Sequence, residues 1–539
     1  MASRTEPAAP PVAIASPAVE AEPTGARRRI YDRRWWILIV LSVSLLIVII
    51  DDTIINVAVP TLQRELGASA TALQWIVDAY IIAFAGLLFT AGSLGDRFGR
   101  KRLLQLGLVV FGAASVFGAY SASVEQLIAA RALMGVGGAL IMPSTLSVLI
   151  DVFPREERVK AIGIWTGVAS LGIPIGPIVG GWLLENFWWG SAFLLNLPIA
   201  IGALAAGWVL VPESRDPSPR RVDVTGLVLS GVALTALVYG IIEAPFSGWA
   251  SWTVLGALGI ALVSGAAFIT YEGRVRQPML DLQLFRNPRL SWGVVAMTLA
   301  ALALGGLAFE LTQFLQFVQG YSPLEAGLRF LPLAIGFGIA GPVTNRLVRR
   351  IGSARTVAVA LAVVGVHLGL LSFAWPTISY WLVGTSLLLI GLGIGGAFVP
   401  STDAVMAAVP EASAGLGSAI NDAGRQVGAA LGIGIVGAIA NAGYVSGIAD
   451  AVGVLPPETA ASAERSIGAA LQVAEELGGS TGAALRTAAD AAFMDGFGAG
   501  LLIAALLALA GGFLVLRRLP SRDVQDATSS VGPVGGGSA

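Results

Sequence analysis

Three ionisable residues, Asp51, Asp78 and Arg131, lie inside long apolar stretches of this 539-residue chain. A charged side chain at membrane depth is costly and is functional by default. A carboxylate close to an arginine keeps its charge, whereas one buried alone binds a proton more readily. A carboxyl group that moves between these surroundings can bind and release a proton. We therefore expect Asp51 to carry a coupling proton and Arg131 to tune it; a fixed structural ion pair is the alternative.

Further polar residues lie close to this pair. Asp78 is expected to be a second proton site, a contact for a cationic substrate or a structural partner of Arg131. Asp52 follows Asp51 directly, so on a helix it points about 100° away. It is expected to face either a cavity or an interhelical contact, and Asp52 and Asn56 are candidate substrate contacts. The rise per residue places Asp51, Asp78 and Arg131 in the outer third of one half-bundle.

A polar stripe is expected along a later apolar segment. It consists of Glu310, Gln313, Gln316 and Gln319, three residues apart, with Phe309, Phe314 and Phe317 between them. Such a stripe is expensive against lipid, so we expect it to line a central cavity. A carboxylate, amides and rings suit a bulky lipophilic cation. The predicted substrate contacts are Glu310, Gln313, Phe314, Gln316 and Phe317, and Glu310 is also a candidate proton-coupling residue; hydrogen bonding between helices is the alternative.

The composition excludes several classes of protein. Hydrophobic residues make up 55% of the chain and charged residues 12%, about half the charge of an average soluble domain. A soluble enzyme, a nucleic-acid binder and a disordered scaffold are therefore disfavoured. The chain has no cysteine and one histidine, His367, which excludes disulfides, thiolate or histidine-rich metal sites and a histidine triad. No cofactor and no nucleic-acid partner are expected, and His367 is interpreted as a packing residue.

The apolar residues form blocks that are long enough to cross a membrane. A spanning helix needs roughly 20 apolar residues. Fourteen such blocks lie near 35–58, 71–94, 103–121, 125–150, 160–185, 190–211, 223–243, 252–271, 291–318, 324–346, 355–374, 378–406, 414–440 and 492–516. Arginine-rich and nearly cation-free loops alternate between them, which places both termini in the cytoplasm. The chain is thus expected to be an all-α polytopic membrane protein.

An internal repeat divides the chain. Residues 92–101 and 341–350 align without a gap, with a small residue, a polar turn residue and basic residues in register. We expect two related six-helix bundles at 34–212 and 276–518, with a two-helix insertion at 213–275. The other predicted regions are a disordered cytoplasmic tail at 1–33, a long extracytoplasmic loop at 441–491 and a cytoplasmic tail at 519–539. The loop is expected to hold one or two short helices, either as a cap or as a passive connector.

The repeated loop contains candidate gate residues: Gly92, Asp96, Arg97, Gly99 and Arg100 in the first copy, and Asn345 and Arg346 in the second. Asp96 can accept hydrogen bonds from a helix N-terminus and pair with Arg97 or Arg100. Such a cluster could hold the cytoplasmic side shut in one state of the cycle. A basic loop that only sets the topology is the alternative. Asp403, Asp422 and Arg425 are expected to make inner-gate or structural contacts.

Glycines at four-residue spacing form a second candidate gate. Gly172, Gly176 and Gly180 fall near one helix face and allow close approach of another helix. Pro174 and Pro177 remove backbone donors and bend this helix. We expect a sealed contact between the two halves, with the span that contains Gly336, Gly338 and Gly341 as its partner. Ordinary packing within the membrane is the alternative.

These motifs together resemble the major facilitator superfamily, and more narrowly its fourteen-span drug:proton antiporter family. The resemblance rests on 92–102, 51–60, 131–139, 172–181, 320–327 and 421–428, within 35–518. Met134 and Val348 depart from the family pattern, which usually has glutamine and glycine there. The resemblance implies an exporter. We expect it to act as a monomer in an inner (plasma) membrane, and the excess of arginine over lysine favours a bacterial origin. It would exchange protons for lipophilic, often cationic, small molecules by alternating access.

Two other functions are alternatives. One is proton-coupled transport of a single endogenous solute, lipid or antibiotic. The other is a membrane-embedded lipid enzyme, which would need a clustered catalytic set, whereas the acids here are scattered in depth. ATP hydrolysis is not expected, since no phosphate-binding Gly-x-x-x-x-Gly-Lys-Ser/Thr sequence is present.

Overall fold

Fourteen helices of the computed structural model are long and apolar enough to cross a membrane. The structure describes residues 25–215, 222–373, 377–409 and 414–520, and in these ranges every regular element is a helix. The all-α, fourteen-span prediction is therefore confirmed. Most of the two predicted tails, 1–24 and 521–539, lies outside the described residues.

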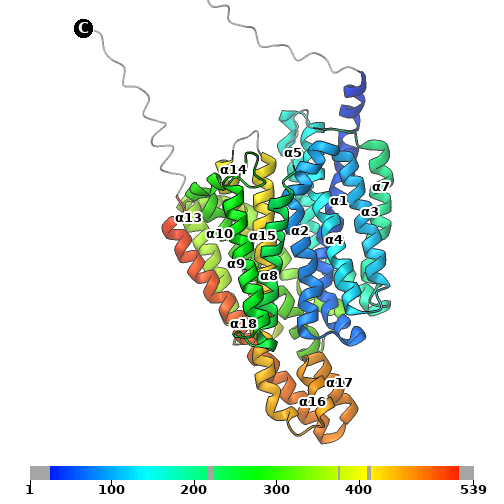
Figure 1. The fold of residues 1–539 in the computed structure, drawn as a ribbon, viewed down its shortest axis with the longest axis vertical. Helices are drawn as coiled ribbons and strands as arrows, with labels where there is room; N and C mark the ends of the chain where they lie inside the picture. The colour runs from blue at the N-terminus through cyan, green and yellow to red at the C-terminus, as the bar shows by residue number, and fades with distance from the viewer. Residues whose placement is uncertain (1–24, 216–221, 374–376, 410–413, 521–539) are drawn as a thin grey trace, which may run out of the picture.

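The first half of the molecule is a helical bundle (Figure 1), and it contains six spans. Its helices are α1 (Gly25–Leu66), α2 (Ala70–Phe98), α3 (Arg100–Ala119), α4 (Val124–Val152), α5 (Arg155–Asn186), α6 (Ser191–Leu194) and α7 (Asn196–Leu210), with α6 and α7 forming one span. Helix α1 begins earlier than the predicted tail boundary at residue 33. Arg34 anchors this end, because its guanidinium stacks 3.6 Å from the Tyr31 ring centroid and lies 2.6 Å from Glu157 of α5.

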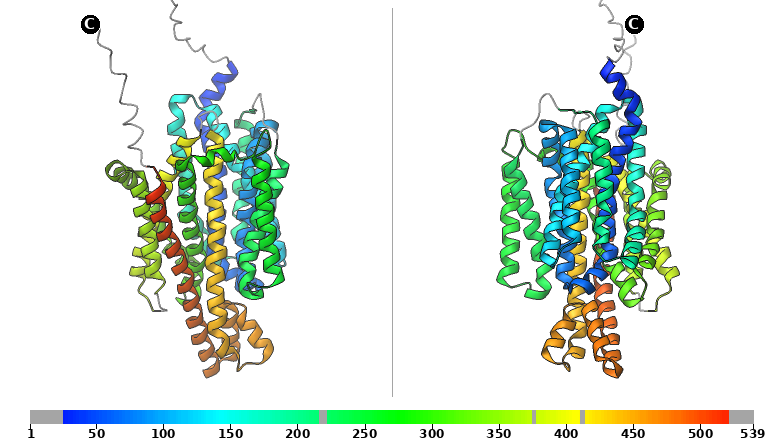
Figure 2. Two further views of the ribbon diagram at one scale, coloured as in Figure 1. Left: turned by 60° about the vertical axis from the view of Figure 1, so that its left-hand side comes forward. Right: turned by 90° about the vertical axis from the view of Figure 1, so that its right-hand side faces the viewer.

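The second half repeats this arrangement. It contains η1 (Leu282–Arg286), α10 (Pro288–Gln313), η2 (Phe314–Val318), α11 (Pro323–Arg329), α12 (Leu331–Ile351), α13 (Ser353–Leu371), α14 (Tyr380–Ala408), α15 (Ala414–Val452) and α18 (Gly479–Arg518). The π-helical turn η2 continues α10, and α11 leads into α12 as one span. The two bundles lie side by side in Figures 1 and 2.

Two extra helices occupy the predicted insertion. Helices α8 (Val224–Ser247) and α9 (Trp252–Glu272) pack on each other. Helix α8 also contacts α2 of the first bundle and α15 of the second, including a ring contact of 6.0 Å between Trp75 and Tyr239. In Figure 2 the pair stands at the edge of the molecule, beside the junction of the two halves. The insertion therefore covers that junction from one side.

Most of the predicted loop 441–491 is helical. Helix α15 continues to Val452, α18 begins at Gly479, and α16 (Pro457–Glu464) and α17 (Ile467–Leu477) lie between them. Two short helices lie within this segment, and both flanking helices extend into it. Many alanine and glutamate residues here favour helix, so the two spans extend beyond the apolar blocks. We call residues 457–477, which contain α16 and α17, the cap. The end of the bundle beside the cap is the cap end, and the opposite end is the arginine-rich end.

The cap joins the two halves at the cap end of the bundle (Figure 1). The Gln472 side chain donates to the backbone carbonyl of Arg64, and the backbone N–H of Ala70 donates to the carbonyl of Arg465. Arg64 and Ala70 belong to the first half, whereas the cap is part of the second. The cap is therefore a packed element and not a loose connector.

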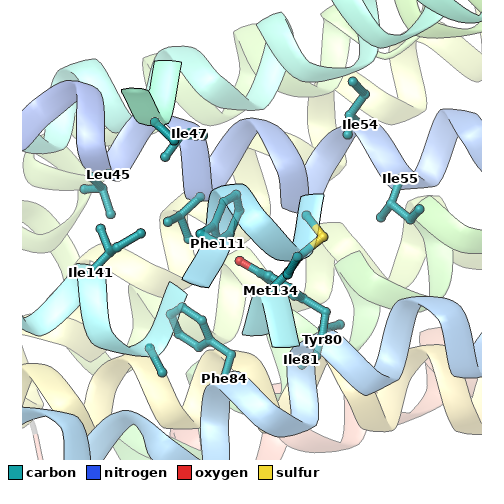
Figure 3. Close-up of a cluster of buried hydrophobic side chains, with 14 of the residues drawn as sticks. Leu45, Ile47, Ile54, Ile55, Tyr80, Ile81, Phe84, Phe111, Met134 and Ile141 are labelled. Carbon is teal, nitrogen blue, oxygen red and sulfur yellow. The ribbon is translucent and has the colours of Figure 1, made fainter. Parts of the chain in front are cut away.

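Large side chains fill the interior of the first bundle. Figure 3 shows Tyr80, Phe84, Phe111 and Met134 between α1, α2, α3 and α4, and all four are fully buried. Met134 stands where the family that this chain resembles usually has a glutamine, and it packs in this apolar cluster. This core fixes the helices that carry Asp51 and Arg131.

Candidate functional site

Asp51 and Arg131 form a buried ion pair. The Nη1 atom of Arg131 lies 2.6 Å from Oδ2 of Asp51, and both side chains are 0% exposed. Arg131 Nε donates to the Ile76 carbonyl at 3.1 Å, so α4 holds α1 and α2 together here. The structure brings together the two residues expected to form the proton site.

Asn196 completes the surroundings of Asp51. Its side-chain amide donates to Oδ1 of Asp51 at 2.7 Å and to Ser115 at 3.2 Å. The Tyr80 ring centroid lies 4.5 Å from the Arg131 guanidinium carbon on another side. Both oxygens of Asp51 thus have donors in this conformation. Asn196 was not predicted, and the one available signal was an amide in an otherwise apolar block.

Asp78 lies apart from this pair. It is 0% exposed, and neither of its carboxyl oxygens has a hydrogen-bond partner among the described residues. The predicted pairing with Arg131 is absent here, since that guanidinium bonds Asp51 and Ile76. A buried, unpartnered carboxyl group is stable in neutral form.

A cavity of about 260 Å³ lies between the two bundles. Its walls include Asp52, Asn56 and Tyr80 of the first half, and Phe337 and Phe398 of the second. The structure therefore places Asp52 and Asn56 where a substrate could reach them. A largely apolar cavity with a few polar groups is typical of small-molecule sites.

The second half contributes charges to the same cavity. Asp422 and Arg425 pair with each other and line the cavity, and Arg425 lies 5.7 Å from the Phe398 ring centroid. Asp403 is exposed and does not line it. His367 packs between α13 and α14, where its Nδ1 lies 3.4 Å from the Ser386 hydroxyl.

The polar stripe does not line the central cavity. None of its predicted substrate contacts, Glu310, Gln313, Phe314, Gln316 and Phe317, lies in the cavity wall. Gln316 donates to the Val57 carbonyl at 2.9 Å, and Phe314 stacks on Phe497 at 5.3 Å. Since η2 is a π-helical turn, three-residue spacing no longer gives one face there. Gln316 therefore makes a hydrogen bond between helices, as the alternative interpretation of the stripe predicted.

The glycine stripe packs inside the first half and not across the two halves. A Cβ at Gly172, Gly176 or Gly180 would lie within 3 Å of side chains of α1, namely Ile49, Thr53 and Ile54. The expected partner span does contact α5, through α11 and α12. Its named glycines do not make this contact, since Gly336 faces α14 and Gly338 and Gly341 have nothing within 4 Å. Sequence spacing shows that a close contact exists but not which helix makes it.

Helix α5 also contacts the second half, at the residue that follows Gly180. A Cβ at Gly181 would lie 2.5 Å from the Pro323 carbonyl oxygen, and one at Gly327 would lie 2.2 Å from the Pro177 carbonyl oxygen. Helices α5 and α11 therefore close the two halves together near the cap end. Of the predicted residues, only Pro177 takes part in this contact.

The first copy of the repeated loop forms a cluster at the arginine-rich end. Arg100 pairs with Asp96 at 2.9 Å and also with Asp151 of α4. Gly99 has a φ of 114°, which favours glycine, and a Cβ there would overlap the Glu213 carboxylate. Gly92 has open space around it, and Arg97 lies over the Phe98 ring at 5.4 Å. The cluster links α2, α3 and α4, all within the first half.

The second copy is built differently. Asn345 and Arg346 are exposed, and no hydrogen bond or ion pair to either is found in the described part of the chain. Helix α12 continues through Val348 to Ile351, and the turn is made by Gly352 at a φ of 83°. Valine cannot easily adopt the left-handed conformation that Gly99 has in the first copy, and the turn lies four residues after Val348.

No group of three or more potential metal ligands occurs among the residues whose placement is described. Two six-span bundles around a central cavity, with a sealed ion pair beside it, define the architecture of a membrane transporter for small molecules.

Comparison with known families gives the same class. Residues 41–433 match the family model of the Major Facilitator Superfamily, and the chain belongs to this family. It is 37% identical over 495 residues to the multidrug efflux pump LfrA of Mycolicibacterium smegmatis, covering 92% of this chain and 98% of the relative. It is 36% identical over 468 residues to the methyl viologen resistance protein SmvA of Salmonella typhimurium, covering 86% and 93%.

Further relatives share the fold and length. The tetracenomycin C resistance and export protein of Streptomyces glaucescens is 33% identical over 492 residues, covering 90% of this chain and 91% of the relative. Among solved structures, a bacterial homologue of the human lysosomal transporter Spinster superposes with a TM-score of 0.64 at 19% identity, covering 90% of this chain and 97% of that one. The predicted superfamily fold is confirmed.

Proposed function

We propose that this protein is a proton-coupled exporter of lipophilic, often cationic, compounds. The observation that carries the proposal is the sealed pair of Asp51 and Arg131, adjacent in sequence to Asp52 in the cavity wall. The relatives named for efflux and resistance support export of drugs, dyes or antibiotics. A proton taken up by Asp51 would change the charge balance beside the cargo site.

The coupling follows from the charges around Arg131. When Asp51 is ionised it neutralises Arg131, and Asp52 leaves the cavity negative and attractive to a cation. When Asp51 binds a proton, the positive charge of Arg131 is balanced only by Asp52, and attraction for a cationic cargo falls. Proton and cargo therefore compete through Arg131, as antiport requires. Asn196, which bonds Asp51, and Asn56, which lines the cavity, would tune the two sites.

We propose the following setting for this cycle. The arginine-rich end is cytoplasmic, both termini lie on that side, and the protein works as a monomer in a bacterial plasma membrane. Asp96 and Arg100, together with the turn at Gly99, stiffen the cytoplasmic end of the first bundle. Helix α5 transmits movement from α1 to α11, because its glycines touch α1 and Gly181 touches α11.

Transport by purified protein in sealed vesicles tests the proposal. A pH gradient is imposed, and flux is measured for ethidium, methyl viologen and a panel of neutral lipophilic compounds. Flux of several unrelated cations that follows the gradient supports the proposal, and flux that ignores it contradicts it. Dependence on one compound alone would favour the second candidate, a dedicated exporter such as the name of the Streptomyces relative describes.

A further inference from the structure

A second, much smaller cavity lies near the cap end. Its volume is about 30 Å³, and it is bounded by α2, α10, α15, α17 and α18. A buried water needs roughly 10–15 Å³ by a comparable measure. The cavity is therefore large enough for one or two waters and too small for a lipophilic cargo.

Glu310 is the one carboxylate in the wall of this small cavity. Its side chain is 2% exposed, and no hydrogen bond or ion pair to it is found within the described ranges. The wall also contains Gln74, Gln313 and Asn441, and the buried Nδ2 of Asn441 has no partner. An unpartnered amide donor and an unpartnered carboxyl group in one water-sized space suit a bridging water.

No positive charge faces Glu310. The wall contains no lysine, arginine or histidine, and its other titratable residue is Tyr444, whose hydroxyl donates to the Ala463 carbonyl at 2.8 Å. Two further carboxylates, Glu464 and Asp490, interact electrostatically with Tyr444. An ionised carboxylate without a counter-charge in a buried site is strongly unfavourable. A bound proton is the simplest way to neutralise Glu310.

This site is separate from the cavity of about 260 Å³ in which we place the transported compound, called the cargo cavity below. Ala308, two residues before Glu310, lines the large cavity, whereas Glu310 lines only the small one. Residues two apart on a helix point in different directions. A cargo molecule in the large cavity therefore need not touch Glu310.

The cap closes the small cavity. Ser466 and Ile467 of the cap belong to its wall, and a Cβ at the next residue, Gly468, would lie 2.8 Å from Gln63 and 3.0 Å from Phe317. Gln63 belongs to the first half and Phe317 to the second. Separation of the halves at this end must therefore move the cap residues that close the small cavity beside Glu310.

We propose that Glu310 and Asn441 form a hydrated proton-binding site, outside the cargo cavity, that exchanges its proton with the cap side when the cap moves. Glu310 takes up one proton at a carboxylate oxygen, and a water held by Asn441 carries it to and from the cap end. The inference rests on the proposed proton-coupled export, to which it adds a second proton for each cycle. Asn441 is a positioning residue for the water.

Two measurements on the full-length protein test this site. In vesicles, the number of protons moved per ethidium is obtained from the pH gradient that just balances a known ethidium gradient. In detergent, infrared difference spectra between high and low pH report the carbonyl band of a protonated carboxyl group. The variant is Glu310→Gln, which keeps the shape of the neutral acid. The matched control is Glu458→Gln, which removes one exposed cap carboxylate.

We expect a different result for each variant. Glu310→Gln should lower the proton number by about one and remove one carbonyl band, whereas Glu458→Gln should change neither. Asn441→Leu should keep the band and slow its hydrogen–deuterium exchange several-fold, because the water is lost. An unchanged band in Glu310→Gln overturns the proposal, and so does a band that responds to sodium alone at constant pH. If the wild-type protein shows no pH-driven transport but the Glu310 band titrates, the proposed function fails and the site stands.

Discussion

Arg131 donates to Asp51 across 2.6 Å in a place that solvent does not reach, and Asp52, the next residue, lines the cargo cavity. One turn of α1 therefore presents one carboxylate to the protein interior and the other to the cavity. The two acids respond to the same guanidinium from different sides. In the proposed mechanism, this relationship links proton binding to the attraction of a cation.

Removal of Arg131 should destabilise the protein. In Arg131→Met the Asp51 carboxylate loses its partner, and breaking a buried pair costs about 3–5 kcal/mol. We expect a lower unfolding temperature in detergent, measured by tryptophan fluorescence. The double variant Asp51→Asn/Arg131→Met should recover most of the loss. Equal stability of the single and double variants would show that the pair contributes no specific interaction.

Asp52 should discriminate cargo by charge. In Asp52→Asn the cavity loses a negative charge, and we expect cation affinity to fall about tenfold, which corresponds to about 1.4 kcal/mol. Binding of ethidium and of a neutral lipophilic compound is compared by fluorescence titration, and only the first should weaken. Equal weakening of both compounds would indicate a structural role for Asp52.

The close contact of α1 and α5 should be sensitive to one methyl group. In Gly176→Ala the new Cβ would lie 2.0 Å from the Thr53 hydroxyl oxygen, and overpacking of this kind costs about 1–3 kcal/mol. Both thermal stability and transport should fall. Gly163→Ala on the same helix is the control, since nothing lies within 4 Å of that position. If the two variants behave alike, the packing described for α5 is incorrect.

The two copies of the repeated loop should differ in importance. Arg100→Gln removes the contacts to Asp96 and Asp151 and should lower transport several-fold, because the arginine-rich ends of α2 and α4 are no longer tied. Arg346→Gln, at the exposed second copy, should have little effect. Flux under the same pH gradient, normalised to the amount of protein in the vesicles, measures both. A larger defect in Arg346→Gln contradicts this assignment.

The spans could be predicted from the sequence because the length of an apolar block is a local property. The pairing of Asp51 with Arg131 could also be anticipated, since few groups at that depth can neutralise each other. The prediction for the polar stripe was wrong for two reasons. Glu310 and Gln313 lie on a face of α10 that lines the small cavity, and the π-helical turn after Gln313 changes which of the later residues share that face. The predicted partner of the glycines was wrong for another reason. Their spacing indicates that another helix approaches closely, but which helix contacts Gly176 depends on the tertiary structure. Asn196 gave only a weak signal, because one amide in an apolar block has many explanations.

The most direct test of the central claim compares wild type with Asp51→Asn in vesicles under an imposed pH gradient. Ethidium efflux and proton movement are recorded together, and exchange of ethidium without a gradient serves as the control for folding. We predict that wild type moves protons against ethidium, whereas Asp51→Asn exchanges ethidium but ignores the gradient. Gradient-driven efflux at the wild-type rate in Asp51→Asn would contradict the account.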